Sequence, residues 1–166
     1  MSQTPTSVPT GANLSSWEGT DAFACGCACR FFRLTEEWGL KMFDSESMRD
    51  GTLELQTLAA EHGLGPPVGP SVTIPGYLDY AWGYFTRVAE VMPRPNFNKD
   101  SGKCVYPKGY DALERRFQSI DRKRLKRMCK KIGFTAGDMH EYNLGFFEGE
   151  PVIVDFDSDR NWKCEE

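Results

Sequence analysis

Three polar residues near the end of the chain have types and spacing suited to binding a metal and a phosphate. Asp138 lies in a polar segment, Asn143 precedes an apolar run, and Asp155 ends a second apolar run after a Glu-Gly-Glu turn. If the runs form a hairpin in which Phe147 pairs with Pro151, Asn143 lies opposite Asp155, about 5 Å away at the Cα atoms. Carboxylate and amide oxygens are hard ligands, typical of Mg²⁺ sites. The pattern therefore predicts a Mg²⁺ and polyphosphate site at the open end of a hairpin.

The same segment resembles the catalytic loop and metal motif of protein-kinase-like phosphotransferases. The shared order is Asp138, four intervening residues, Asn143, a hairpin, and Asp155 followed by Phe156. Gly-Asp-Met-His-Glu-Tyr-Asn is similar to the aminoglycoside-phosphotransferase branch, and its Glu-Tyr-Asn is similar to RIO-type atypical kinases. The resemblance implies ATP and Mg²⁺ as cofactors, with Asn143 and Asp155 holding the metal. It also implies that Asp138 is the catalytic residue, which accepts or orients the acceptor hydroxyl.

The resemblance implies a lysine and a glutamate upstream that bind and position the phosphates. Lys41, in the apolar run Trp-Gly-Leu-Lys-Met-Phe, matches the third-strand lysine that holds the α- and β-phosphates. Glu54 matches the helix glutamate that orients this lysine, with Glu46 and Glu61 as rivals. From residue type alone, Lys41 would be a surface lysine on an edge strand. Its place in the ordered set favours the site instead.

Other nucleotide-binding positions follow from the same resemblance. Glu90 and Met92 lie where a hinge between two lobes would receive adenine on its backbone groups. Gly19 and Phe23 match the first glycine and the aromatic tip of a glycine-rich loop, although Asp21 and Ala24 replace its other glycines. The resemblance covers about residues 17–157 and implies a much reduced helical lobe.

The order of the expected elements favours an α+β protein of kinase-like fold, with an antiparallel N-lobe sheet, a helix, a minimal helical C-lobe and a catalytic hairpin. We expect three parts: a disordered tail at 1–16, an N-lobe at 17–93, and a reduced C-lobe with the catalytic loop at 94–166. The expected elements are strands at 27–34 and 38–43, a helix at 44–62, a connection at 63–76, one or two strands at 77–92, a loop at 94–109, and two helices within 110–132.

Composition restricts the class of protein. The chain has 166 residues and a net charge of −4, and none of its apolar runs approaches the ~18 residues of a membrane helix. Its six cysteines are too sparse for a disulfide scaffold, which predicts a reducing, cytoplasmic protein. Cys25, Cys27 and Cys29 alternate along an expected strand. Their spacing favours small core residues over a metal or redox site, which would use wider spacing.

A basic run stands out against the acidic remainder of the chain. Residues 115–131 contain nine Lys and Arg against Asp121 alone, a net charge of +8, so the other residues together carry −12. A solvated helix face is one interpretation. The others are docking of RNA, docking of an acidic partner, or pairing with the acidic C-terminal region of the chain itself.

These observations predict an ATP- and Mg²⁺-dependent kinase that transfers phosphate to a Ser/Thr hydroxyl of a protein, because little of the chain remains to enclose a small molecule. One alternative is a non-catalytic kinase-like binding module, favoured by the reduced lobe and the poor glycine-rich loop. A second is a RIO-like RNA-associated ATPase, which would combine the basic run with the Glu-Tyr-Asn motif. A homodimer that supplies the substrate lobe in trans is a further expectation. No membrane partner is expected.

Overall fold

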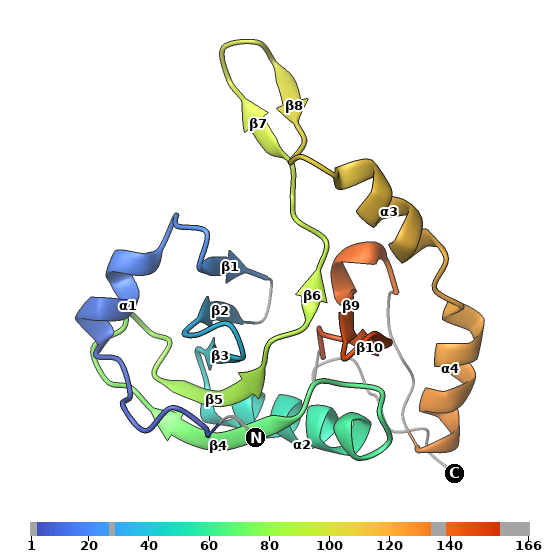
Figure 1. Cartoon of the computed structure of the whole chain (residues 1–166). Helices are drawn as coiled ribbons and strands as arrows, with labels where there is room; N and C mark the ends of the chain where they lie inside the picture. The colour runs from blue at the N-terminus through green and yellow to red at the C-terminus, as the bar shows by residue number, and fades with distance from the viewer. Residues whose placement is uncertain (1–2, 27–28, 134–138, 157–166) are drawn as a thin grey trace.

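A five-stranded antiparallel sheet dominates the computed structural model, which describes residues 3–26, 29–133 and 139–156 (Figure 1). Its order is β1-β2-β3-β5-β4, with bounds β1 Phe23–Cys25, β2 Arg30–Arg33, β3 Trp38–Phe43, β4 Val68–Thr73 and β5 Trp82–Arg87. All six residues of the central strand β3 are buried, as in a strand covered on both faces. The sheet and its helices confirm the predicted α+β class.

The two faces of the sheet pack against different parts of the chain. Leu40 and Met42 of β3 face a cluster that includes Leu14 of α1 (Gly11–Trp17) and Tyr77. Since side chains alternate along a strand, Lys41 points to the other face, where it contacts helix α2. The lysine is therefore held between the sheet and a helix.

Helix α2 (Glu46–Glu61) lies against β3, β4 and β5 and is close to the helix expected at 44–62. The Ser45 hydroxyl accepts a hydrogen bond from the Met48 backbone N–H at 3.2 Å and caps the first turn. Gly51 lies inside the helix without interrupting it. The chain leaves the helix through Gly63, whose φ of +70° is a conformation that glycine adopts readily.

The second half of the chain builds a small sheet beside two helices (Figure 1). The order of strands in this sheet is β10-β9-β6, and the short 3-10 helix η1 directly precedes β9. The two helices, α3 and α4, fall within 110–132 as predicted. Their bounds are β6 Glu90–Val91, α3 Tyr110–Gln118, α4 Arg122–Lys131, η1 Glu141–Asn143, β9 Leu144–Phe147 and β10 Glu150–Ile153. One core cluster joins these elements to Leu55 and Ala59 of α2, so α2 contributes to the packing of both halves.

The expected disordered tail is wrong for its second half. Residues 11–17 form α1, capped by Thr10, whose hydroxyl accepts from the Asn13 N–H at 3.3 Å. Leu14 is completely buried against the sheet. A Cβ atom on Gly11 would lie 2.3 Å from the carbonyl carbon of Gly76, so only glycine allows this approach. Tertiary packing thus orders a segment whose composition alone indicates disorder.

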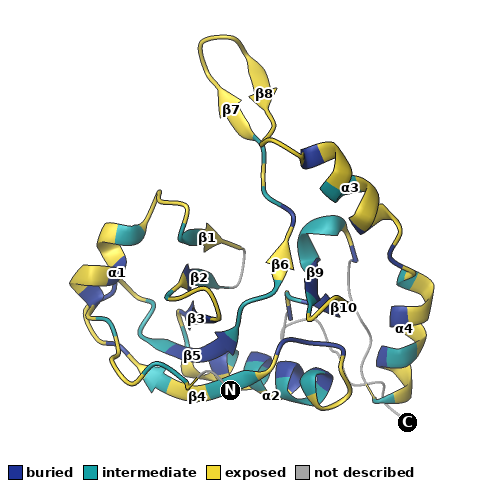
Figure 2. Ribbon diagram, in the orientation of Figure 1, coloured by how far each residue is buried: buried dark blue, intermediate teal, exposed yellow. Residues whose placement is uncertain are grey.

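Two segments expected as connections contain strands. The expected connection at 63–76 includes β4, where Pro70 is tolerated because β4 is an edge strand and needs no N–H donor on its outer side. The expected loop at 94–109 includes β7 (Asn96–Asn98) paired with β8 (Lys103–Val105). This hairpin projects from the molecule and all its strand residues are exposed (Figure 2).

The C-terminal hairpin forms with a register one residue from the expected one. Phe147 pairs with Glu150 rather than with Pro151, and the Val154 N–H donates to the Asn143 carbonyl at 3.0 Å. The reason is a two-residue turn in which Glu148 and Gly149 both have positive φ, +51° and +82°. Such a turn matches the twist of the flanking strands better than the three-residue turn we expected.

Candidate functional site

Lys41 is the buried cation of the candidate site. It lies on β3, its residue is 7% exposed, and its Nζ donates to Gln56 Oε1 at 3.0 Å and to the Val154 carbonyl at 2.7 Å. The second contact joins the N-terminal sheet to the residue directly before Asp155. The structure thus brings the predicted phosphate-binding lysine to the predicted metal-binding hairpin, 113 residues away along the chain.

Gln56 is the helix residue that positions Lys41, in the place predicted for Glu54. Glu54 is exposed, whereas Gln56 is completely buried. The two residues are two apart, and two positions on a helix differ by about 200° of rotation, which places them on opposite faces. The contact between lysine and helix is therefore made by a neutral amide. A signal was present in the sequence, because Gln56 lies four residues after Thr52 and three before Ala59, on the inner face of the helix.

The Gln56 side chain has every hydrogen-bonding position of its amide filled. Its Oε1 accepts from Lys41 and also from the Tyr84 hydroxyl at 2.7 Å. Its Nε2 donates to the Pro66 carbonyl at 2.9 Å and to Thr86 Oγ1 at 2.7 Å. Four hydrogen bonds are the full capacity of a carboxamide. They fix the orientation of the amide and, through it, the position of the Lys41 ammonium.

The surroundings of Lys41 shift its pKa in opposite directions. Burial lowers the pKa of Lys41, and the Cys29 thiol and the Asp155 carboxylate act in the opposite direction. Burial also raises the pKa of Cys29 to about 11, so this thiol is neutral near pH 7. An ammonium carries three N–H donors. Among the described residues, Gln56 Oε1 and the Val154 carbonyl accept two of them.

The proposed metal ligands lie at the end of the C-terminal hairpin. Asn143 closes η1 and is half-buried, and Asp155 follows β10 and is exposed. The corrected register pairs Asn143 with Val154, so Asp155 is one residue beyond the position directly opposite Asn143. Asp155 acts electrostatically on both Lys41 and Tyr84, which places its carboxylate near the buried face of the sheet.

The predicted catalytic residue Asp138 lies outside the described residues, but the structure shows how the loop after it is held. The Met139 carbonyl accepts a hydrogen bond from Arg122 Nε at 2.9 Å. His140 Nδ1 accepts from the Tyr142 N–H at 3.2 Å and caps η1. His140 therefore orders the loop through this contact.

The residues predicted for the glycine-rich loop are placed differently. Gly19 lies in the turn before β1, and Phe23 begins β1 and packs on Phe32, with ring centroids 5.3 Å apart. Between β1 and β2, the Gly26 N–H donates to the Cys29 carbonyl at 3.0 Å. This connection, rather than residues 19–24, brings a side chain, Cys29, into the surroundings of Lys41. The prediction that Cys25 and Cys29 share one strand is wrong, since β1 ends at Cys25.

The predicted hinge residues serve the core and an ion pair through their side chains. Glu90 lies in β6, forms a salt bridge with Arg116 of α3, and pairs with Phe146 of β9. Met92 is 3% exposed and belongs to the core cluster that joins α2 to the second half of the chain. Any contact with adenine would therefore involve their backbone groups, as the prediction states.

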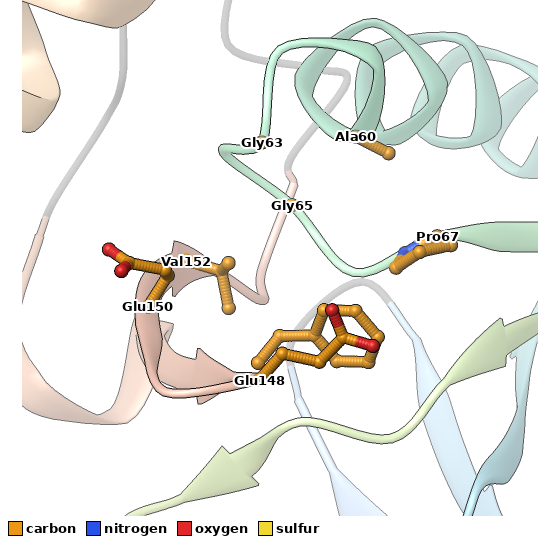
Figure 3. Close-up of a pocket in the computed structure, with 8 residues that line it drawn as sticks. Ala60, Gly63, Gly65, Pro67, Glu148, Glu150 and Val152 are labelled. Atoms are coloured by element: carbon orange, nitrogen blue, oxygen red, sulfur yellow. The ribbon is translucent and has the colours of Figure 1, made fainter.

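A separate cavity of about 260 Å³ lies away from Lys41, between the end of α2 and the C-terminal hairpin (Figure 3). Ala60, Gly63 and Pro67 line one side, and Glu148 and Glu150 lie on the other. Its lining includes none of the predicted site residues. The cavity therefore does not contribute to the candidate site.

The described residues contain no preformed metal cage. Within 3–26, 29–133 and 139–156, no cluster of three or more His, Cys, Asp or Glu could hold a metal ion. Mg²⁺ is commonly bound by one or two carboxylates together with substrate phosphates, so Asn143 and Asp155 suit it in that role.

The helices of the described chain include none that could cross a membrane. Comparisons with protein-family models, with curated proteins and with solved structures found no match to this chain.

Proposed function

We propose that the protein is an ATP- and Mg²⁺-dependent phosphotransferase of kinase-like fold that acts on a Ser/Thr hydroxyl of a protein. The observation that carries the proposal is the 2.7 Å contact between Lys41 Nζ and the Val154 carbonyl. It joins a buried strand lysine to the hairpin end where Asp155 lies. Phosphoryl transfer depends mainly on positioning and charge stabilisation, and this contact provides the basis for both.

The arrangement of elements supports the kinase-like fold. In chain order, strands β1 to β3 of the antiparallel sheet come first, and helix α2 follows against the lysine-bearing strand β3. Strands β4 and β5 complete the sheet, the short β6 comes next, and the β9-β10 hairpin lies near the end of the described chain. The resemblance noted in the sequence implies this same order. Lys41, α2 and the β9-β10 hairpin meet at one place, as that family requires of its nucleotide site.

Each residue has a defined task in the proposed reaction. Lys41 donates an N–H to a phosphate oxygen and offsets the phosphate charge. Asn143 and Asp155 hold Mg²⁺, which neutralises charge on the β- and γ-phosphates when bound. Asp138 accepts or orients the acceptor hydroxyl. Gln56 keeps Lys41 in place through a neutral amide, so it adds no negative charge that would compete with phosphate.

The same glutamine favours a second candidate function, a non-catalytic nucleotide-binding module. The resemblance implies a glutamate at the position that orients the lysine, and this chain uses the neutral Gln56 there. In this alternative, the site binds ATP and Mg²⁺ but does not transfer phosphate. Binding and transfer must therefore be measured separately.

The test measures Mg²⁺·ATP binding by calorimetry and phosphate transfer with labelled ATP and protein acceptors. Asp155→Asn should abolish both, because the metal loses its carboxylate, whereas Asp138→Asn should retain binding and lose transfer by ~10²-fold or more. Lys41→Met should weaken binding strongly. Asp79→Asn, the same change at an exposed position before β5, is the matched control and should alter neither. Binding without transfer in the unmodified protein would favour the non-catalytic module, and absence of binding would refute both functions.

A further inference from the structure

The segment from Arg94 to Lys131 is net basic, with a charge of +8 in residues 115–131 and +1 in residues 94–114. It contains thirteen Lys and Arg against four Asp and Glu, a net charge of +9, so the remaining residues carry −13. The segment comprises the β7-β8 hairpin, α3 and α4, which follow one another along the same edge in Figure 1. The protein is therefore strongly polarised, with its positive charge concentrated on one structural unit.

Most of the Lys and Arg side chains of helix α4 lie on the face away from the core. Leu125 and Cys129 are buried, and Arg122 is held by the Met139 carbonyl. The opposite face is exposed (Figure 2) and its basic residues are Lys123, Arg124, Lys126, Arg127, Lys130 and Lys131. Among the residues that the structure describes, no salt bridge involves any of these six. Their charge is not balanced by the described part of the protein.

The hairpin adds exposed aromatic rings to the same region. Phe97 on β7 is 61% exposed and Tyr106, just after β8, is 56% exposed. The Tyr106 ring packs on Tyr110, the first residue of α3, with centroids 4.7 Å apart, which fixes it beside the helices. A solvated helix face needs no such rings. Basic side chains and exposed aromatic rings on one edge are features that bind single-stranded nucleic acid, since phosphates pair with the cations and nucleobases stack on the rings.

We propose that residues 94–131 bind single-stranded nucleic acid, with the outer face of α4 contacting phosphates and Phe97 and Tyr106 stacking on bases. This inference stands independently of the proposed phosphotransferase function. The acidic remainder of the chain would repel the strand and so restrict it to this edge. An acidic protein partner would use the charge of α4 but would have no use for the two rings.

The test measures fluorescence anisotropy of the full chain with a labelled uridine 20-mer RNA and a thymidine 20-mer DNA between 50 and 200 mM salt. With about six phosphate contacts to a single strand, the slope of log K against log salt should be about −4, a loss of ~300-fold across this range. Lys126→Gln, Arg127→Gln and Lys130→Gln together should reduce the slope by about 2. The charge-preserving exchange Lys126→Arg, Arg127→Lys and Lys130→Arg is the matched control and should leave the slope unchanged.

The aromatic contribution is tested by Phe97→Ala, which should weaken binding by ~10-fold or more without altering the slope. Leu78→Ala, at an exposed apolar residue outside the region, is its control and should have no effect. No binding at 50 mM salt would overturn the proposal. Equal competition by polyglutamate, together with no effect of Phe97→Ala, would also overturn it and indicate an acidic protein partner instead.

Discussion

Replacing Gln56 with leucine tests whether the buried amide organises the candidate site. Leucine has nearly the same size, but it removes all four hydrogen bonds of the amide. The Tyr84 hydroxyl and the Pro66 carbonyl then lose the partner that the structure gives them, at about 1–3 kcal/mol for each buried group. Lys41 keeps only its bond to Val154, and losing a hydrogen bond to a charged group costs about 1.5–3 kcal/mol. We therefore expect a loss of about 4 kcal/mol or more in the free energy of unfolding.

Urea denaturation measures this loss directly. With a slope near 2 kcal/mol per molar for a domain of this size, the midpoint should fall by about 2 M while the slope stays constant. Gln118→Leu, at an exposed position at the end of α3, is the matched control and should change stability by no more than about 0.5 kcal/mol. A fall of less than about 1 kcal/mol for Gln56→Leu would show that the hydrogen bonds do not stabilise the site.

A double-mutant cycle separates the hydrogen-bond effect from simple loss of packing. Tyr84→Phe alone removes one hydrogen bond to Gln56 and should cost about 1 kcal/mol. In the Gln56→Leu background the same change removes a hydroxyl without a partner, so it should be neutral or stabilising. The coupling should be about 1–2 kcal/mol. Equal costs in both backgrounds would refute the assignment of Gln56 as the organiser of the network.

Three further predictions test the turn, a buried tyrosine and the thiols. Glu148→Asn should raise the stability by about 0.5 kcal/mol, measured by urea denaturation, because asparagine followed by Gly149 suits a turn with two positive φ angles. Burial and a hydrogen bond to a carboxylate raise the pKa of Tyr77 from 10.0 to about 12, so its contribution to stability is complete below pH 10 and is lost as the pH rises to 12; unfolding at pH 9 and 11 should show a smaller fall for Tyr77→Phe than for the unmodified protein. Mass spectrometry after brief alkylation at pH 8 should find Cys104 modified and Cys129 protected, because Cys104 is exposed whereas burial raises the pKa of Cys129 to about 11; equal labelling would contradict the packing of α4.

Local patterns in the sequence predicted the elements around the site but not the contacts between them. The helix at 44–62 and the strand containing Lys41 follow from caps and apolar spacing, and both are present. The choice of Glu54 came from the resemblance and ignored the phase of the helix. The inner face of α2 is defined by buried residues spaced three and four apart, which include Thr52, Leu55, Gln56 and Ala59.

The remaining errors arise where long-range packing or a turn decides the structure. Nothing local in the uncharged N-terminal segment signals that Leu14 will be buried, because its partners lie on strands much later in the chain. The register of the C-terminal hairpin depends on whether its turn has two or three residues. Glu148 in a positive-φ conformation is an uncommon choice that composition does not reveal.

The choice of an amide beside Lys41 bears on both functions proposed for the site. A buried ammonium hydrogen-bonded only to neutral groups costs stability, because its desolvation is not offset by a paired charge. Asp155 acts on it electrostatically but is exposed, so that carboxylate remains accessible to a metal ion. An anion bound beside Lys41 would supply the missing charge and recover the cost of burial. On the proposed function, Lys41 would therefore stabilise a bound phosphate, whether or not that phosphate is subsequently transferred.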